Sequence, residues 1–389
     1  MKNITIGLMG LAFHSGNLGC SALSYSFMYM LEEIAAENGL HFDVKIIFQS
    51  DDKTPLKLEY KHIDYSFVRL GFKNKEHKKQ TNDAIKQCDV VFDFTMGDSF
   101  TDIYGKERFI KRTMFKQMVL RQKTPLVLGS QTYGPYNSGL CRIWASSVIK
   151  RSREVFARDE QSRELAARLG KRNPVLTTDV AFFLPYEKIQ QDSGRIHIGL
   201  NVSGLLWNGG YTSDNQFGLT VDYREYITSI MEKYAQDNSY AVHLIPHVIY
   251  KNQDDAPDND WAVSCELAEK YENVRLSPFF ESPMQAKSYI SGMDVFIGAR
   301  MHATIAAYSS GVAVIPFSYS RKFEGLFGSL SYPYVISGKK ESTEDAVRKT
   351  IAYISEKERL KNAITEFGSE LENKKKKMME NYSSVILNK

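Results

Sequence analysis

Short apolar runs alternate with stretches of helical periodicity along the first half of the chain. Each apolar run has the length of a buried β-strand. The runs cover residues 4–11, 44–48, 90–94, 126–129 and 155–157. Between the first two runs, apolar residues recur every three or four positions, which predicts a helix over residues 21–36. This order of strand, helix and strand is typical of βαβ units and a mostly parallel sheet.

A second alternating series begins after a polar stretch at residues 185–195. The strands expected in this series cover residues 196–202, 241–245, 273–276, 294–298 and 312–315. The helices expected in it cover residues 223–234, 261–271 and 283–290. The last helix has a clear start, because Ser282 is a good N-cap and Pro283 suits the first helical turn.

The two series predict an α/β fold of two Rossmann-like, doubly wound domains that face a cleft. We place the N-terminal domain at residues 1–187, the C-terminal domain at residues 196–342 and a charged helical tail at residues 343–389. A length of 389 residues agrees with two domains. Because ligands of such folds bind at the carboxyl ends of the strands, the informative residues should follow strands directly.

The composition argues against several classes of protein. A net charge of +4 is small for this length and gives no support for nucleic-acid binding. The four cysteines are scattered without a C-x-x-C pair, which argues against a zinc site, an iron–sulfur site and a disulfide framework. They are Cys20, Cys88, Cys141 and Cys265. We therefore expect no metal, no cofactor and a reducing cytoplasmic location.

The sequence predicts at most a peripheral contact with a membrane. No apolar stretch approaches the ~18 residues that a membrane span needs. The apolar run at residues 4–11 is short and is followed by polar residues, so we interpret it as a strand and not as a signal peptide. Four consecutive lysines at residues 374–377 have two interpretations. They form either a solvated helical face or a site of attraction to an anionic membrane or a lipid-linked phosphate.

The strongest candidate site follows the strand expected at residues 294–298. Arg300 and His302 would stand between this strand and the next helix, where free backbone N–H groups favour an anion. Arginine adds a planar fork that suits phosphate or carboxylate. The alternative is that Arg300 forms a structural ion pair and that His302 is a satisfied helix-terminal histidine. Tyr319 and Lys322 follow the next strand and would join the same site.

A second cationic position is Arg158, which follows the strand at residues 155–157 and is expected to point outward. Asp159 suits the N-cap of a helix expected at residues 160–169. Arg158 is therefore either a ligand-binding residue or a partner in a local ion pair.

Other strand ends carry side chains that can hydrogen-bond sugar hydroxyls. These candidates are Asn17, Asp98, Asp102, Gln131 and His247. Each stands in a loop with glycine or proline, so a role in the turn is the alternative to ligand binding. The first loop lacks the G-x-G-x-x-G and G-x-x-x-x-G-K-[ST] patterns, which argues against a dinucleotide or P-loop site.

An acidic segment follows His247. It contains Asp254, Asp255, Asp258 and Asp260. Their spacing lacks the glycine and the terminal glutamate of an EF-hand. We interpret the segment as a solvated acidic loop without a metal.

Taken in order, these segments resemble the polysaccharide pyruvyltransferase family. The motifs are G-N-L-G-x-x-A at residues 16–22, G-D-S-F-x-D at 97–102, Q-x-x-G-P at 131–135, A-R-D-x-x-S at 157–162, T-D-V-A-F at 178–182, I-P-H at 245–247, G-A-R-M-H-A at 298–303 and S-Y-S-x-K-F at 318–323. Each motif alone is weak, whereas their order and their placement at strand ends match over most of the chain.

The resemblance implies a GT-B-like arrangement with a phosphoenolpyruvate donor held mainly by the C-terminal domain. It implies that Arg158, Arg300, His302 and Lys322 handle the donor, and we add Tyr319 to this group. The N-terminal domain would then face the acceptor, a sugar or a lipid-linked or nucleotide-linked oligosaccharide.

The activity implied is transfer of a pyruvyl group to sugar hydroxyls of a cell-surface polysaccharide or its precursor, with formation of a ketal and release of phosphate. We expect His302 to protonate the methylene carbon of phosphoenolpyruvate while an acceptor hydroxyl attacks C2. One rival is a nucleotide-sugar glycosyltransferase, which the same architecture hosts. Another is a non-catalytic relative, because Cys20 and Met96 depart from the residues that many members carry.

Overall fold

The computed structural model describes residues 3–48, 53–71, 74–192, 194–250 and 256–388, which form two compact units. The first unit comprises Met1–Phe13, Leu23–Phe183 and Glu372–Lys389, and the second comprises His14–Ala22 and Leu184–Leu371. The sequence predicted the change of domain within the polar stretch that begins at Pro185, close to the observed division. It assigned the first loop to the N-terminal domain and the tail to neither, whereas the structure gives the loop to the second unit and divides the tail.

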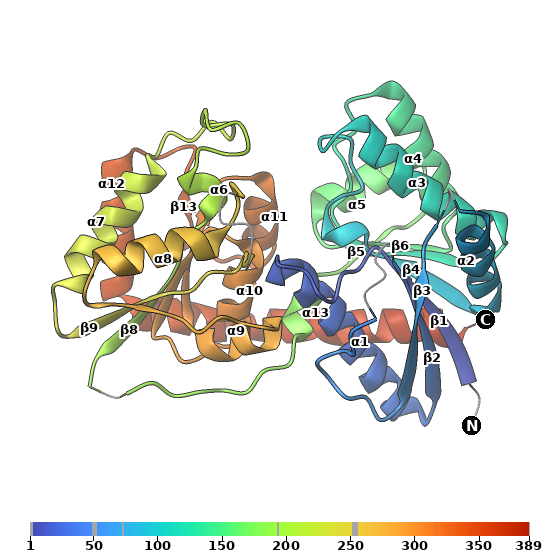
Figure 1. Ribbon diagram of the computed structural model, residues 1–389, viewed down its shortest axis with the longest axis horizontal. Coiled ribbons are helices and arrows are strands. Elements are labelled where there is room, and N and C mark those ends of the chain that lie inside the picture. Colours follow the sequence, from blue (N-terminus) through green and yellow to red (C-terminus); the bar gives the residue numbers. More distant parts are fainter. Residues whose placement is uncertain (1–2, 49–52, 72–73, 193, 251–255, 389) are drawn as a thin grey trace. The chain divides into compact units, whose positions relative to one another are not determined.

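Seven parallel strands form the sheet of the first unit (Figure 1). They are β1 (Asn3–Met9), β2 (His41–Phe48), β3 (Ile63–Arg69), β4 (Val90–Asp93), β5 (Leu126–Gln131), β6 (Glu154–Ala157) and β7 (Val175–Leu176). The order in the sheet is β3-β2-β1-β4-β5-β6-β7, as in a doubly wound fold. Every residue of β4 and β5 is buried, because helices cover both faces of a parallel sheet.

The helices of the first unit connect these strands. They are α1 (Leu18–Asn38), α2 (Lys75–Gln87), α3 (Lys106–Arg121), α4 (Gly139–Arg151) and α5 (Glu160–Arg168), with 3-10 turns at Thr95–Gly97 and Val180–Phe183. Helix α5 begins as predicted, because the side chain of Asp159 accepts the backbone N–H of Ser162 at 2.8 Å.

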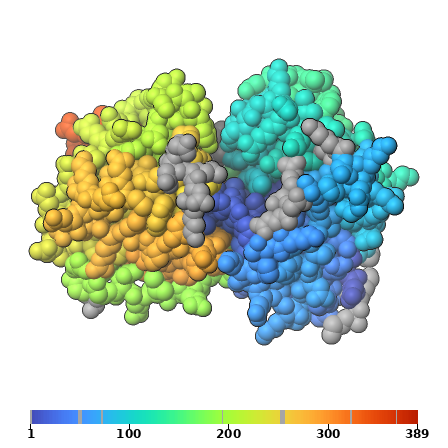
Figure 2. Space-filling view, viewed as in Figure 1, coloured from blue at the N-terminus to red at the C-terminus, as the bar shows by residue number. Residues whose placement is uncertain are grey.

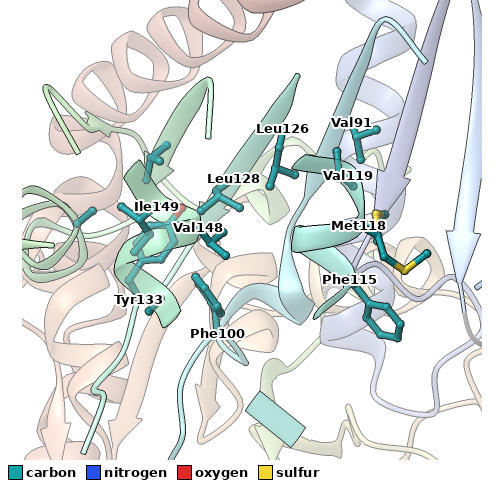
Figure 3. Close-up of a cluster of buried hydrophobic side chains, with 14 of the residues drawn as sticks. Val91, Phe100, Phe115, Met118, Val119, Leu126, Leu128, Tyr133, Val148 and Ile149 are labelled. Atoms are coloured by element: carbon teal, nitrogen blue, oxygen red, sulfur yellow. The ribbon is translucent and has the colours of Figure 1, made fainter. Parts of the chain in front are cut away.

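Helices α3 and α4 each pack one face against the core of the first unit. Figure 3 shows their buried side chains packed on side chains from β4 and β5. The side chains labelled there are Val91, Phe100, Phe115, Met118, Val119, Leu126, Leu128, Tyr133, Val148 and Ile149. Since this packing uses only one face of each helix, the opposite faces of α3 and α4 form part of the surface of the unit.

The end of the last helix, α13 (Lys357–Leu387), belongs to the core of the first unit. The ring of Tyr382 is fully buried and stacks on Phe156 with centroids 4.4 Å apart. Its hydroxyl accepts the backbone N–H of Ser130 at 2.9 Å. Met378 and Ile386 are also buried. The charged tail predicted from the sequence is therefore not a separate segment from Glu372 onward but a structural element of this unit.

Six parallel strands form the sheet of the second unit. They are β8 (Ile196–Asn201), β9 (Tyr240–Leu244), β10 (Val274–Leu276), β11 (Val295–Gly298), β12 (Ala313–Ser318) and β13 (Ile336–Ser337), in the order β10-β9-β8-β11-β12-β13. The helices are α6 (Gly204–Trp207), α7 (Tyr223–Ala235), α8 (Asp260–Lys270), α9 (Pro283–Ile290), α10 (Met301–Ser309), α11 (Arg321–Ser329) and α12 (Thr343–Ser355). The predicted cap of α9 is confirmed, since Ser282 Oγ accepts the N–H of Gln285 at 3.3 Å.

In each sheet the strand order reverses once, between β1 and β4 in the first unit and between β8 and β11 in the second. The loops that follow the two strands at such a point run in opposite directions, which leaves room for a ligand at the carboxyl edge. Within the described residues, no helix is both long enough and apolar enough to span a membrane.

Candidate active site

The segment after β11 positions Arg300 and His302 at the start of α10. The backbone N–H of Arg300 donates to Asn201 Oδ1 at 3.0 Å, and Asn201 is the last residue of β8. This hydrogen bond joins the two strands of the switch point. The sequence predicted both residues between the strand and the helix. In the structure Arg300 is the N-cap residue of α10, and His302 is already the second residue of the helix. The free N–H groups and the helix dipole at this end favour an anion.

The guanidinium of Arg300 forms a buried ion pair with Asp260, the first residue of α8. Nε lies 3.1 and 3.2 Å from the two carboxylate oxygens, and Nη2 donates to Oδ1 at 2.7 Å. Nη2 also donates to the carbonyl of Asp258 at 2.7 Å. Burial alone would lower the pKa of Arg300, but the charge of Asp260 and the hydrogen bonds to it outweigh this effect and raise that pKa. The structural ion pair considered from the sequence is therefore present.

Asp260 connects several parts of the second unit. Its carboxylate accepts the backbone N–H groups of Gly204, His247 and Val248 at 2.9, 3.2 and 3.0 Å. The side chain is fully buried. The prediction of a solvated acidic loop was wrong for this residue, because a carboxylate with one guanidinium and several N–H donors is satisfied without water. Asp254 and Asp255 of that predicted loop lie outside the described residues.

The first loop of the chain packs against His302. A hydrogen bond from Leu18 N–H to His247 O at 3.0 Å and one from Ile249 N–H to Gly16 O at 2.7 Å hold the loop on the segment after β9. A Cβ on Gly19 would lie 2.4 Å from Nδ1 of His302. Glycine is therefore required for this approach of backbone to imidazole.

Asn17 belongs to the same loop. Its Oδ1 accepts the N–H of Gly19 at 3.0 Å, which shapes the start of α1. The sequence assigned Asn17 to the acceptor side in the N-terminal domain, whereas the structure groups it with the second unit and beside His302.

His247 lies buried near these residues with 3% of its surface exposed. Neither ring nitrogen has a hydrogen-bond partner among the described residues. Burial, followed by the electrostatic effects of the nearby His302 and Arg300, lowers the pKa of His247 to about 3. The imidazole is therefore neutral at physiological pH, and its nitrogens can each engage a polar group of a ligand.

Tyr319 and Lys322 follow β12. Tyr319 is half-buried and packs edge-on against Phe217, with ring centroids 5.1 Å apart. It is near enough to Arg300 to interact with the guanidinium electrostatically. Lys322 lies in the first turn of α11, but its side chain is outside the described part of the structure. A hollow of about 860 Å³ in the second unit is lined by α6, the loop to α7 and Pro257, close in sequence to Asp258.

Arg158 of the first unit is buried, with 4% exposure, so the prediction that it points outward was wrong. Nη1 donates to Asp179 at 2.8 Å and Nε donates to Thr132 Oγ1 at 2.8 Å. Nη2 is buried and has no hydrogen-bond partner among the described residues. The ion pair with Asp179 accounts for the burial of Nη1. Nη2 remains a hydrogen-bond donor that a ligand could satisfy.

Three further candidates belong to the first unit: Asp98 and Asp102 follow β4, and Gln131 is the last residue of β5. Both oxygens of Asp102 accept backbone N–H groups of the loop before α4, from Asn137 at 2.9 Å and Ser138 at 2.7 Å, which is a structural role. Gln131 is fully buried and donates to the carbonyl of Asp93 at 2.9 Å. Asp98 is half-buried and accepts the hydroxyl of Tyr104 at 3.2 Å.

Sequence reasoning missed a buried ion pair next to these residues. Nζ of Lys116 lies 2.9 Å from Asp93 Oδ1 and donates to Thr95 Oγ1 at 2.7 Å, with the side chain of Lys116 fully buried. Lys116 lies on the buried stripe of α3 that also contains Phe109 and Thr113. A charge on a core-facing stripe needs a buried partner.

Asn201, Asp179 and Asp260 were also missed as parts of the sites. Asn201 ends an apolar strand with a polar residue, and Asp179 stands in the T-D-V-A-F motif, so each carried a local signal. The described residues contain no group of three or more histidine, cysteine, aspartate or glutamate side chains arranged to hold a metal ion.

Comparison with solved structures finds the same architecture in a UDP-GlcNAc 2-epimerase and a sucrose-phosphate synthase. UDP-GlcNAc 2-epimerase from Neisseria meningitidis, solved with UDP-GlcNAc, is 13% identical, with 94% of each chain covered and a TM-score of 0.55. Sucrose-phosphate synthase from Thermosynechococcus elongatus is 12% identical, with 99% of this chain and 100% of that chain covered and a TM-score of 0.60. At these identities the likeness shows the GT-B fold alone.

A search of curated proteins gave no significant match. The model of the family described as polysaccharide pyruvyl transferase matches residues 17–321. The match begins in the loop that packs on His302 and includes β11, the start of α10 and β12. This chain therefore belongs to the polysaccharide pyruvyl transferase family and is a transferase.

Proposed function

We propose that this chain transfers the pyruvyl group of phosphoenolpyruvate to two hydroxyls of a sugar in a cell-surface polysaccharide or its precursor. The observation that carries the proposal is the family match over residues 17–321, which contains Arg300 and His302 at the start of α10. The anion-favouring end of that helix suits a small donor that carries a carboxylate and a phosphate.

The reaction balances without an oxidant or a reductant. One acceptor hydroxyl bonds to C2 of phosphoenolpyruvate while a proton is added to the methylene carbon, which becomes a methyl group. A second hydroxyl then bonds to C2 as the C2–O bond to phosphate breaks. The product is a ketal with a free carboxylate. The two acceptor hydroxyls release two protons in total: one replaces the proton that was added to the methylene carbon, and the other leaves with inorganic phosphate.

His302 is the proposed general acid at the methylene carbon. The backbone at Gly19 fixes one edge of its imidazole, so the ring is held in a defined orientation, as proton transfer in a transition state requires. His247 is less suited to this role, because its pKa of about 3 leaves it without the second ring proton at neutral pH. A neutral His247 can instead hydrogen-bond an acceptor hydroxyl and orient it.

The donor charges would be met by a set of cations and dipoles. Nε and Nη2 of Arg300 face Asp260 and Asp258, so a donor anion would meet Nη1. Tyr319 and Lys322, which follow β12, are proposed to complete donor binding in this unit. Arg158 is proposed to contribute through Nη2, the buried donor without a protein partner among the described residues.

The acceptor contacts are proposed at Asn17, Asp98, Gln131 and His247. Asp102 is proposed to act on the acceptor only through the loops that it joins, since both of its oxygens accept backbone N–H groups. Whether the sugar is lipid-linked or nucleotide-linked is decided by supplying each kind of acceptor.

Donor identity can be tested by thermal unfolding with phosphoenolpyruvate and, in parallel, with UDP-GlcNAc. Only the true donor should raise the transition temperature of the protein. Release of phosphate from phosphoenolpyruvate, dependent on a matched acceptor, then tests turnover. His302→Gln should lower turnover about 10²-fold or more while leaving the affinity for phosphoenolpyruvate nearly unchanged. Stabilisation by UDP-GlcNAc alone would overturn the proposal.

A further inference from the structure

Helix α4 is apolar on two opposite faces. The inner face buries Cys141, Ala145, Val148 and Ile149 in the core. The outer face exposes Leu140 at 56%, Ile143 at 67% and Trp144 at 36%. A surface helix ordinarily presents polar side chains to water. An apolar stripe at positions i, i+3 and i+4 on the exposed face therefore indicates a surface that binds a partner.

Helix α3 packs beside α4 and extends this surface (Figure 1). Its Met114 is 43% exposed. A hollow of about 450 Å³ is lined by residues of α2, α3 and α4. Its apolar lining is Met114, Met118, Ile143 and Trp144, and its cations are Lys78 and Arg121. We call the outer surfaces of these two helices, with Leu140, Ile143, Trp144 and Met114, the α3–α4 face; this part of the chain reaches the surface in the space-filling view (Figure 2).

The charged residues of helices α3 and α4 are almost all positive. Helices α3 and α4 together carry nine lysine and arginine residues and one acidic residue, Glu107. The whole chain has a net charge of only +4. Of the nine cations, Lys116 is buried in its ion pair with Asp93. Arg121 and Lys78 line the same hollow as Met114, Ile143 and Trp144, and Lys111 and Arg142 are exposed on the same two helices. These cations give the face a positive potential.

The loop before α3 carries further exposed apolar side chains. Ile103 and Tyr104 are 49% and 39% exposed and follow Asp102, whose carboxylate accepts the N–H groups of Asn137 and Ser138 just before α4. The loop before α3 and the loop before α4 are thus tied together. Tyr104 in turn donates to Asp98, so the face adjoins one of the proposed acceptor contacts.

We propose that the α3–α4 face binds the surface of an anionic phospholipid bilayer. Leu140, Ile143, Trp144 and Met114 would enter the boundary between headgroups and acyl chains, and the surrounding lysine and arginine side chains would contact lipid phosphates. The pairing of an apolar stripe with a rim of cations is the pattern that such surfaces require. This inference does not depend on the chemistry of the reaction.

A second copy of the chain fits this face poorly. In a two-fold symmetric dimer the same surface would face itself, so the cations of α3 and α4 would oppose one another. The lysines at residues 374–377 fit a bilayer less well than the α3–α4 face. Lys375 pairs with Glu372 at 2.9 Å and lies over the ring of Phe183 at 5.3 Å within the first unit.

Co-sedimentation of the full chain with vesicles tests the proposal. Vesicles of phosphatidylcholine alone are compared with vesicles that also contain phosphatidylglycerol. The wild-type chain should bind the anionic vesicles and show little binding to the neutral ones, with the affinity falling as salt is added. The double variant Leu140→Ser/Ile143→Ser should bind at least about tenfold more weakly, and Lys111→Gln/Arg142→Gln about 25-fold more weakly, since each cation contributes about fivefold.

Matched controls are Leu176→Ser, at a leucine 44% exposed on β7, and Arg168→Gln on α5. Both should bind like the wild-type chain, and thermal unfolding should show that all variants remain folded. Equal binding to neutral and anionic vesicles, or no binding to either, would overturn the proposal. Unchanged binding by the double variants would also overturn it, as would a dimer that Leu140→Ser/Ile143→Ser dissociates in the absence of lipid.

Discussion

Replacing Arg300 with lysine separates a structural role of this residue from a role in donor binding. The guanidinium contacts both oxygens of Asp260 at 2.7 to 3.2 Å and donates to the carbonyl of Asp258 at 2.7 Å. Lysine keeps the positive charge but has a single nitrogen in place of the planar fork. We expect about two of these hydrogen bonds to be lost in the variant.

The size of the effect follows from the burial of the pair. Asp260 is fully buried and the side chain of Arg300 is 12% exposed. Hydrogen bonds to charged groups contribute about 1.5 to 3 kcal/mol each, and lysine recovers part of this. We expect Arg300→Lys to lower the free energy of unfolding by about 2 to 3 kcal/mol. Asp260→Ala should lower it by about 3 to 5 kcal/mol, because a buried cation is left without its partner.

Urea unfolding followed by tryptophan fluorescence measures this change. Trp207 and Trp261 report on the second unit, and Trp144→Phe removes the signal of the first unit. Arg348→Lys is the matched control, at an arginine of the same unit whose side chain is 74% exposed, and should change the free energy of unfolding by less than about 0.5 kcal/mol.

The two roles are then separated by titration of the folded variant with phosphoenolpyruvate. A donor-binding role predicts a fall in affinity of about tenfold or more in addition to the loss of stability. If the affinity for phosphoenolpyruvate were unchanged, the role of Arg300 would be limited to its structural ion pair with Asp260. If Arg300→Lys were as stable as the Arg348→Lys control, the reasoning from the fork geometry would be refuted.

Three further predictions follow from the packing. Gly19→Ala would bring a Cβ within 2.4 Å of His302 Nδ1, so turnover, measured by phosphate release, should fall about 10- to 100-fold. Gly139→Ala is the control, because a Cβ there meets no atom within 4 Å, and its turnover should equal that of the wild-type chain. Ending the chain after Asn373 removes the buried Met378, Tyr382 and Ile386, so the free energy of unfolding of the first unit should fall by more than about 4 kcal/mol, or the unit should fail to fold. Tyr382→Phe should lower the free energy of unfolding by about 1 kcal/mol, measured by thermal unfolding. Burial is the main cause that lowers the pKa of His243 to about 4 and the pKa of His247 to about 3 in the folded chain. In the unfolded chain both pKa values are near 6.5, so below that pH the unfolded chain binds more protons than the folded chain. Stability that is complete above pH 6.5 should therefore fall on acidification toward pH 4, with a slope of at most about 1.4 kcal/mol per pH unit for each histidine. Urea midpoints at several pH values test this, and His247→Asn should reduce the slope to about half; an unchanged slope would contradict it.

Strands buried on both faces were predictable from the sequence. The expected runs at residues 90–94 and 196–202 differ by one residue from β4 and β8, because short, mostly apolar runs are typical of strands buried on both faces. Strand β3 was missed, since it lies at the edge of its sheet and alternates buried with exposed residues, including Asp64 and Arg69. Helix α3 was missed because its inner stripe contains Lys116, which weakens the apolar periodicity.

The candidate site was predictable only as a set of positions at strand ends. The partners of those residues lie far away in the sequence, with Asp260 at 40 residues from Arg300 and Asp179 at 21 residues from Arg158. No periodicity connects residues at such separations, so the pairs depend on the three-dimensional fold. The position of Asn17 beside His302 was equally invisible, because the first loop joins a unit whose other residues begin at Leu184.

Buried ion pairs stand at the strand ends of both units, and stability alone does not account for them. Replacing such a pair with apolar residues is often neutral or stabilising, because desolvation costs as much as the attraction returns. What the pairs do in this chain is fix loops. Lys116 holds Thr95, which with Met96 has a positive φ that non-glycine residues rarely adopt, directly before Asp98. Asp260 holds Arg300 together with the backbone of His247, so the pair orients two proposed substrate contacts before any ligand arrives.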